Sequence, residues 1–207
     1  MKGCRPLSKE EARLLKDFFL GRLAKRNYAL FVLGASTGFR ISELLSLTIG
    51  DLVDVGGHFK ERITVSRKNM KGQKSSRSNL LNQEACRSLT PWLRQLSEMG
   101  FDRKSDYVFQ SYSNTNKAIT RKHAWRIFIN AFRLGQFPGS LGTHTMRKTY
   151  AKHVYQFYLN QVAQGESVDA FRATSKALGH IDIKSTDQYL SFLTEEIDAA
   201  VNSLEIF

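Results

Sequence analysis

Helical spacing of apolar residues recurs along most of this chain, and one early segment rich in turn residues interrupts it. Ser8 and Glu11 form the capping-box pattern that starts a helix, and apolar residues follow at three- and four-residue intervals. Comparable patterns predict further helices at 28–35, from Arg40 onward, 82–99, 121–134, 143–164, 168–178 and 194–204. The chain is therefore expected to be mainly helical.

A different pattern follows Gly50, where paired turn residues alternate with short β-prone runs. Residues 52–53, 62–65 and 79–81 are typical of short strands joined by polar turns, and 100–116 of a long loop region. The sequence thus predicts an α+β fold, mainly helical, with a small three-stranded antiparallel sheet. We expect residues 1–207 to form a single domain, with a leader at 1–6 and a tail helix within 191–207.

The charge balance is strongly basic. Lysine and arginine total 31 against 19 aspartate and glutamate residues, which gives a formal net charge of +12 over 207 residues. Such an excess favours a polyanionic partner, DNA or RNA first, although charge that only maintains solubility gives the same balance.

The cysteine usage and the apolar runs exclude several classes of protein. Cys4 and Cys86 are not in a CxxC pair, and no histidine–cysteine cluster accompanies them. A disulfide framework and a zinc site are therefore disfavoured, and a reducing cytoplasm fits. No apolar run has the length of a membrane span, and the N-terminus lacks the hydrophobic centre of a signal peptide. We expect a cytoplasmic protein with no membrane partner.

Two arginine motifs have the composition of a phosphate site. Arg40 follows a Thr-Gly pair at the predicted start of a helix, where free backbone N–H groups also favour anions, and Glu43 one turn later is placed to hold its guanidinium. His144 and Arg147 stand three residues apart and share a helix face. An arginine pair can hold a phosphate and neutralise its charge. Taken singly, each motif also fits an exposed ion pair or a chance HxxR sequence.

A very basic segment lies between the second and third predicted strands. Lysines at a hairpin tip usually serve solvation and edge protection. In a DNA enzyme, such a lysine can instead enter the minor groove and protonate the departing 5′ oxygen. The basic side chains of this segment are Arg67, Lys68, Lys71, Lys74 and Arg77.

Tyr189 differs from the other tyrosines because its segment is short and polar and follows Gly179-His180. A tyrosine oxygen can attack a phosphate and keep the bond energy in a covalent ester. Packing in a core or an interface is the commoner role of any single tyrosine, so this interpretation depends on the other motifs.

The order of these motifs resembles the tyrosine recombinase (phage integrase) family over essentially the whole chain from Leu7. The resemblance is carried by Thr37-Gly38-Phe39-Arg40-Ile41-Ser42-Glu43-Leu44, Lys71-Gly72-Gln73-Lys74, His144-Thr145-Met146-Arg147 and Leu178-Gly179-His180 through Tyr189. It implies the family's catalytic domain without the usual N-terminal core-binding domain. Short members, such as the fimbrial phase-variation recombinases, or a catalytic domain cut from a longer protein fit this length. Lys148 departs from the family pattern, in which a second histidine is common.

The resemblance also implies roles at the phosphate. Arg40 and Arg147 would bind the nonbridging oxygens of the scissile phosphate, with Glu43 in support. His144 would accept a proton or orient the reacting groups, and His180 would hydrogen-bond the phosphate.

The remaining implied roles concern strand cleavage and DNA binding. Tyr189 would attack to give a 3′-phosphotyrosyl link and a free 5′ hydroxyl, with no metal or cofactor required. Lys71 would be the general acid, with Lys68 as the alternative. DNA-backbone contacts would come from Arg67, Lys68, Lys74 and Arg77.

The partners that the resemblance implies are double-stranded DNA, a homotetramer on two DNA sites and an accessory DNA-bending protein, in a nucleoid-associated location. The tail helix would pack either on its own domain or on a neighbouring protomer. Two other functions stay open: type IB topoisomerase-like DNA relaxation, and a non-catalytic DNA-binding accessory role with the same fold.

Overall fold

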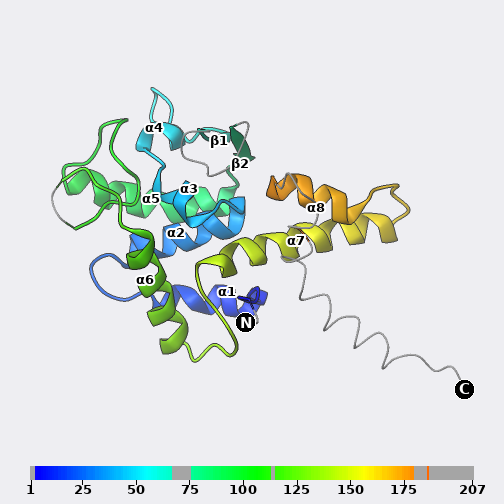
Figure 1. The fold of residues 1–207 in the computed structure, drawn as a ribbon. Helices are drawn as coiled ribbons and strands as arrows, with labels where there is room; N and C mark the ends of the chain where they lie inside the picture. Colours follow the sequence, from blue (N-terminus) through cyan, green and yellow to red (C-terminus); the bar gives the residue numbers. More distant parts are fainter. Residues whose placement is uncertain (1–2, 67–75, 113–114, 180–185, 187–207) are drawn as a thin grey trace, which may run out of the picture. The chain divides into compact units, whose positions relative to one another are not determined.

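The computed structural model describes residues 3–66, 76–112, 115–179 and 186 (Figure 1). The chain divides into two compact units, residues 1–150 and residues 151–207. Among the described residues, no helix is both long enough and apolar enough to cross a membrane.

The first unit is built from helices around one apolar core. Its elements are α1 (Lys9–Leu14), the 3-10 helix η1 (Leu15–Phe18), α2 (Ala24–Thr37), α3 (Ile41–Leu45), α4 (Ile49–Leu52), β1 (Arg62–Val65), β2 (Arg77–Leu80), α5 (Gln83–Glu98), α6 (Arg121–Leu134) and the start of α7 (Thr143–Ala163). Helix α2 packs along α5, as Figure 1 shows. The largest fully buried apolar side chains are Trp92, Phe39, Phe109 and Phe128.

The helix boundaries follow from local capping chemistry. The Ser8 hydroxyl accepts from Glu11 N–H and the Glu11 carboxylate accepts from Ser8 N–H, which confirms the predicted capping box at α1. Asn82 caps α5 by accepting from Ala85 N–H at 2.9 Å. Thr120 caps α6 in the same way. The expected helix at 121–134 is found with the same bounds.

The prediction of three strands was wrong for the described residues, where the sheet has two. Strands β1 and β2 pair antiparallel, with Val65 opposite Arg77 and Ile63 opposite Asn79. Residues 52–53 do not join this sheet. Thr48 and Asp51 form a capping box that holds Ile49–Leu52 as a helical turn, and Val53 makes only an isolated bridge.

Glycines let the start of α7 approach α2 closely. A Cβ added at Gly34 would lie 2.6 Å from the Met146 sulfur, and a Cβ at Gly38 would overlap the ring of Tyr150. Gly34 and Gly38 are one helical turn apart, as are Met146 and Tyr150, so two bulky side chains rest over two positions without side chains. Arg147 is thereby brought to the end of α2.

The second unit contains the rest of α7 and α8 (Ala170–Leu178). Asp169 caps α8 by accepting from Arg172 N–H, and Gly179 ends it in the left-handed conformation. The predicted helix at 194–204 and the tail at 191–207 lie outside the described residues, so their packing stays a prediction.

Candidate active site

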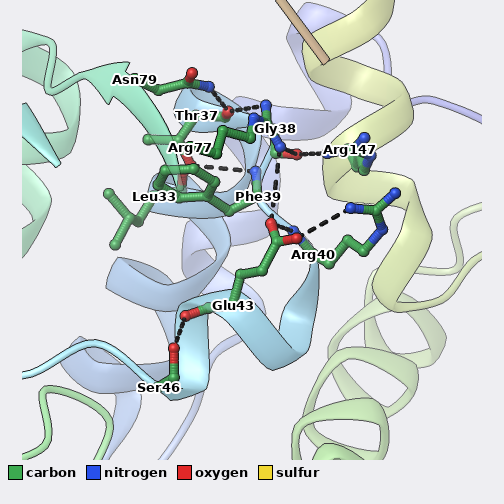
Figure 2. Close-up of polar contacts among 10 residues, drawn as sticks. All are labelled: Leu33, Thr37, Gly38, Phe39, Arg40, Glu43, Ser46, Arg77, Asn79 and Arg147. Carbon is green, nitrogen blue, oxygen red and sulfur yellow. Dashed lines mark hydrogen bonds and ion pairs between the residues drawn. The ribbon is translucent and has the colours of Figure 1, made fainter. Parts of the chain in front are cut away.

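The candidate site is built around the turn that joins α2 to α3. Gly38 ends α2 with a φ of 60°, a conformation that costs glycine little. Its carbonyl oxygen accepts a hydrogen bond from Arg147 Nη1 of α7 and another, at 3.3 Å, from Arg77 Nη1 of β2 (Figure 2). One carbonyl group therefore contacts guanidinium groups from two distant parts of the sequence.

Glu43 supplies the negative charge at this turn. Its side chain is 1% exposed, and its two oxygens accept from the backbone N–H of Arg40 at 2.8 Å and from Arg40 Nη1 at 3.0 Å. The oxygen that accepts from the Arg40 backbone, Oε2, also lies 3.7 Å from Arg77 Nη1. The side chain of Arg40 keeps 34% of its surface exposed, whereas Arg147 is 1% exposed. Figure 2 shows these contacts converging on the turn.

Guanidinium groups gather at this turn. The guanidinium of Arg77 interacts electrostatically with those of Arg147 and Arg40 and with the Glu43 carboxylate. A partly buried site that holds three guanidinium groups, one of which still reaches solvent, attracts an anion with several oxygens, such as a phosphate.

His144 lies on α7 one turn before Arg147, and its side chain is partly covered but still reaches solvent. Partial burial lowers the pKa of its imidazole below the ordinary value, and the neighbouring charges of Arg147, Arg40 and Lys148 lower it further. The imidazole is therefore mainly neutral at pH 7, and a neutral imidazole is able to accept a proton.

The structure brings together four of the residues that the sequence indicated: Arg40, Glu43, His144 and Arg147. Lys71, Arg67, Lys68, Lys74, His180 and Tyr189 lie outside the described residues, and their roles stay predictions. The carbonyl groups of Thr37 and Gly38 are contacts that sequence reasoning missed. Nothing in a sequence pattern marks a backbone carbonyl as a ligand for a side chain.

Arg77 is placed differently from its expected position as a DNA contact. It is 8% exposed, and its guanidinium contacts backbone carbonyls inside the protein. The register of the two strands accounts for this placement. Paired strand residues lie on the same face of a sheet, and Arg77 pairs with Val65, which is buried.

The arginine cluster lies outside the cavity that α3 and α4 help to line. A cavity of about 860 Å³ is lined by residues of α3, α4, β1 and the 107–121 region, but by none of the clustered arginines or Glu43. Across the part of the chain that the structure describes, no group of three or more His, Cys, Asp or Glu side chains could hold a metal ion.

Comparison with known families decides the relationship. Residues 5–196 match the model of the phage integrase family. The chain belongs to the phage integrase family. Its mainly helical fold with a small antiparallel sheet is that of tyrosine recombinase catalytic domains.

Among curated integrase relatives, the chain is 28% identical to the probable integrase/recombinase YoeC of Bacillus subtilis over 149 residues, which cover 72% of this chain and 73% of YoeC. It is 29% identical to the tyrosine recombinase XerD of Rhizobium meliloti over 193 residues, 93% of this chain and 55% of XerD. The chain thus spans about half the length of the Xer relatives it matches.

Solved recombinase structures share the fold at lower identity. The XerH site-specific recombinase, solved in a post-cleavage complex with palindromic difH substrate, aligns at 20% identity with a TM-score of 0.68, covering 96% of this chain and 53% of XerH. The XerA recombinase aligns at 22% identity with a TM-score of 0.68, covering 94% of this chain and 65% of XerA.

Proposed function

We propose that this protein is a site-specific DNA strand transferase in which Tyr189 is the nucleophile. The phenolic oxygen of Tyr189 forms an ester with the scissile phosphorus, and the bond from phosphorus to the 5′ oxygen breaks. Lys71 donates the proton that the departing 5′ oxygen takes up. Attack by a 5′ hydroxyl on the phosphotyrosyl ester reverses these steps and rejoins DNA, so no ATP is consumed.

The observation that carries this proposal is the convergence of Arg40 and Arg147 on one turn. Arg147 donates a hydrogen bond to the Gly38 carbonyl, and Arg40 is held by Glu43 three residues further along the chain (Figure 2). Two fixed guanidinium groups are suited to the charge that develops on the nonbridging oxygens of a phosphate in the transition state. His180 would add a further hydrogen bond to the same oxygens.

His144 fits the role of proton acceptor. Its lowered pKa favours a neutral imidazole at pH 7, and its position one turn before Arg147 on α7 supports a place beside the phosphate. A neutral histidine can take the phenolic proton or orient a group that takes it.

We also propose a substrate, an assembly and a cellular setting, and family membership supports all three. We expect double-stranded DNA as substrate, four protomers on two DNA sites, and an accessory DNA-bending protein in a nucleoid-associated, cytoplasmic setting. XerH has been solved with a difH DNA substrate, which supports DNA as the partner here.

Trapping of a covalent complex tests the proposal. Nicked duplexes that tile the DNA flanking the gene lose a short 5′-hydroxyl fragment on cleavage, so the protein–DNA ester accumulates. Wild-type protein is expected to give an adduct that survives SDS on one or more duplexes, and Tyr189→Phe is expected to give none. Tyr158→Phe is the matched control, because it removes a phenol from α7 in the same unit.

Three other outcomes would point to a different mechanism or function. An adduct that persists in Tyr189→Phe would remove this tyrosine from the mechanism. The absence of any adduct with wild-type protein would favour a non-catalytic DNA-binding role. Relaxation of any supercoiled plasmid without sequence preference would favour the topoisomerase function.

A further inference from the structure

Arg77 is a buried arginine of the cluster at the α2–α3 turn, and the proposed mechanism leaves it without a role. It opens β2, and its guanidinium packs 5.0 Å from the centre of the Phe39 ring. Nη1 donates to the Gly38 carbonyl at 3.3 Å and Nη2 to the Thr37 carbonyl at 3.2 Å. The guanidinium thus spans the last two carbonyl groups before the turn that leads to Arg40.

The same guanidinium contacts the acid that holds Arg40. Nη1 of Arg77 lies 3.7 Å from Oε2 of Glu43, the oxygen that also accepts from the Arg40 backbone. Arg77 therefore contacts the carbonyl that binds Arg147 and the carboxylate that binds Arg40 (Figure 2). Both phosphate-binding arginines are held by groups that Arg77 contacts.

Placing a third cation here opposes stability. Burial, followed by the charge of Arg147, lowers the pKa of Arg77 to about 10, while Glu43 acts in the opposite direction. Arg77 is still protonated at neutral pH. Apolar residues of similar volume often replace a buried charge with no loss of stability, so a buried arginine is weak evidence for a stabilising role. The contacts indicate a role in geometry instead.

We propose that Arg77 is a positioning residue for the phosphate site. It fixes the Thr37 and Gly38 carbonyls and the Glu43 carboxylate, so that Arg147 and Arg40 can bind the same phosphate. This inference rests on the proposed strand-transfer function. It replaces the expectation that Arg77 binds DNA directly. Arg77 follows Lys71, the proposed general acid, by six residues. Its contacts therefore also fix the position of the chain six residues after Lys71.

The test separates DNA affinity from the cleavage rate. Arg77→Met keeps much of the side-chain volume against Phe39 and removes the charge and both hydrogen bonds. We expect its dissociation constant for a nicked duplex cleaved by wild-type protein to stay within about threefold, because other basic residues supply phosphate contacts. The single-turnover cleavage rate at saturating DNA should fall about 100-fold, since a small misplacement of catalytic groups costs this much.

Arg62→Met is the matched control. Arg62 lies exposed on β1 in the same two-stranded sheet, and its loss changes the net charge equally. Its cleavage rate should stay within about threefold of wild type, because its guanidinium contacts only Ser78 among the described residues. Arg77→Lys should give an intermediate rate, since an ammonium group keeps the charge but lacks the planar fork that spans two carbonyl groups.

The outcomes distinguish this inference from the function on which it rests. Wild-type rates in Arg77→Met would overturn the positioning role and leave strand transfer intact. A weaker dissociation constant with an unchanged saturated rate would make Arg77 a DNA ligand. If Arg77→Met does not fold, Arg77→Lys decides by the same comparison, and loss of folding in both would make Arg77 a structural residue only. Failure of wild-type protein to form any adduct would instead count against the proposed function.

Discussion

Arg147 of α7 donates a hydrogen bond to the carbonyl oxygen of Gly38, the residue that ends α2. This contact depends on how closely the two helices approach, because Met146 and Tyr150 pack over Gly34 and Gly38. The packing that places Arg147 is therefore also the packing that a small change at either glycine would disturb.

A methyl group at Gly38 tests this dependence. Gly38→Ala forces a left-handed residue to carry a Cβ, at about 1–2 kcal/mol, and drives that Cβ into the Tyr150 ring, at about another 1–3 kcal/mol. Gly57→Ala is the control, since Gly57 has a φ of 81° and open space around its Cβ position. Urea unfolding should show the larger loss for Gly38→Ala, and equal losses would argue against close packing at this turn.

Removal of the buried negative charge should be costly. Glu43→Gln keeps the shape of the side chain but removes the negative charge that faces the guanidinium groups of Arg40 and Arg77. Loss of one partner from a buried ion pair typically costs about 3–5 kcal/mol of stability. Glu98→Gln, at an exposed position on α5, should change the unfolding free energy by about 0.5 kcal/mol or less. A Glu43→Gln protein as stable as wild type would show that the carboxylate is dispensable.

The pH dependence of stability should report the environment of His144. Its pKa is lowered in the folded state, so between that value and the ordinary value of about 6.5 the unfolded chain binds more protons. The lowered pKa therefore reduces the free energy of unfolding in acid. This reduction is absent above pH 7, grows as the pH falls through about 6.5, and is complete below the folded pKa. His144→Gln removes this reduction.

The measurement is the difference in unfolding free energy between wild type and His144→Gln across pH 5 to 8. The unfolding free energy of wild type should fall relative to that of the variant as the pH falls. A difference that does not change with pH, or one that favours wild type in acid, would contradict the lowered pKa.

Arg40 should matter for cleavage more than for binding. Arg40→Lys keeps a positive charge but lacks the fork that can bind Glu43 and a phosphate oxygen together. Loss of one donor to transition-state charge costs about 10²–10³ in rate, so cleavage of a nicked duplex should fall by that factor. Salt-sensitive binding to unrelated duplex should change little, because many phosphate contacts contribute to it. Arg94→Lys, on an exposed face of α5, is expected to cleave at the wild-type rate.

Helices were predictable because their signals are local. The predicted capping box at Ser8 forms, and the side chains of Asn82 and Thr120 cap α5 and α6, whose starts were predicted to within one residue. The strand prediction at residues 52–53 was wrong because Thr48 and Asp51 form a capping box. That capping box starts a helical turn that includes Leu52, in spite of the β propensity of residues 52–53.

The site was predictable in its residue types and less so in its geometry. The order of Arg40, Glu43, His144 and Arg147 is visible in the sequence, and those residues converge in the structure. The interior placement of Arg77 depends on strand register and on carbonyl groups from a turn about forty positions earlier. Contacts of that range leave no local signal.

The most direct test of the account is to identify the amino acid that holds the DNA in the covalent complex. The trapped adduct would be digested with nuclease and protease, and the modified peptide sequenced by mass spectrometry. We predict a nucleotide on the phenolic oxygen of Tyr189, joined through its 3′ phosphate. A nucleotide on any other residue, or a 5′ linkage, would contradict the mechanism.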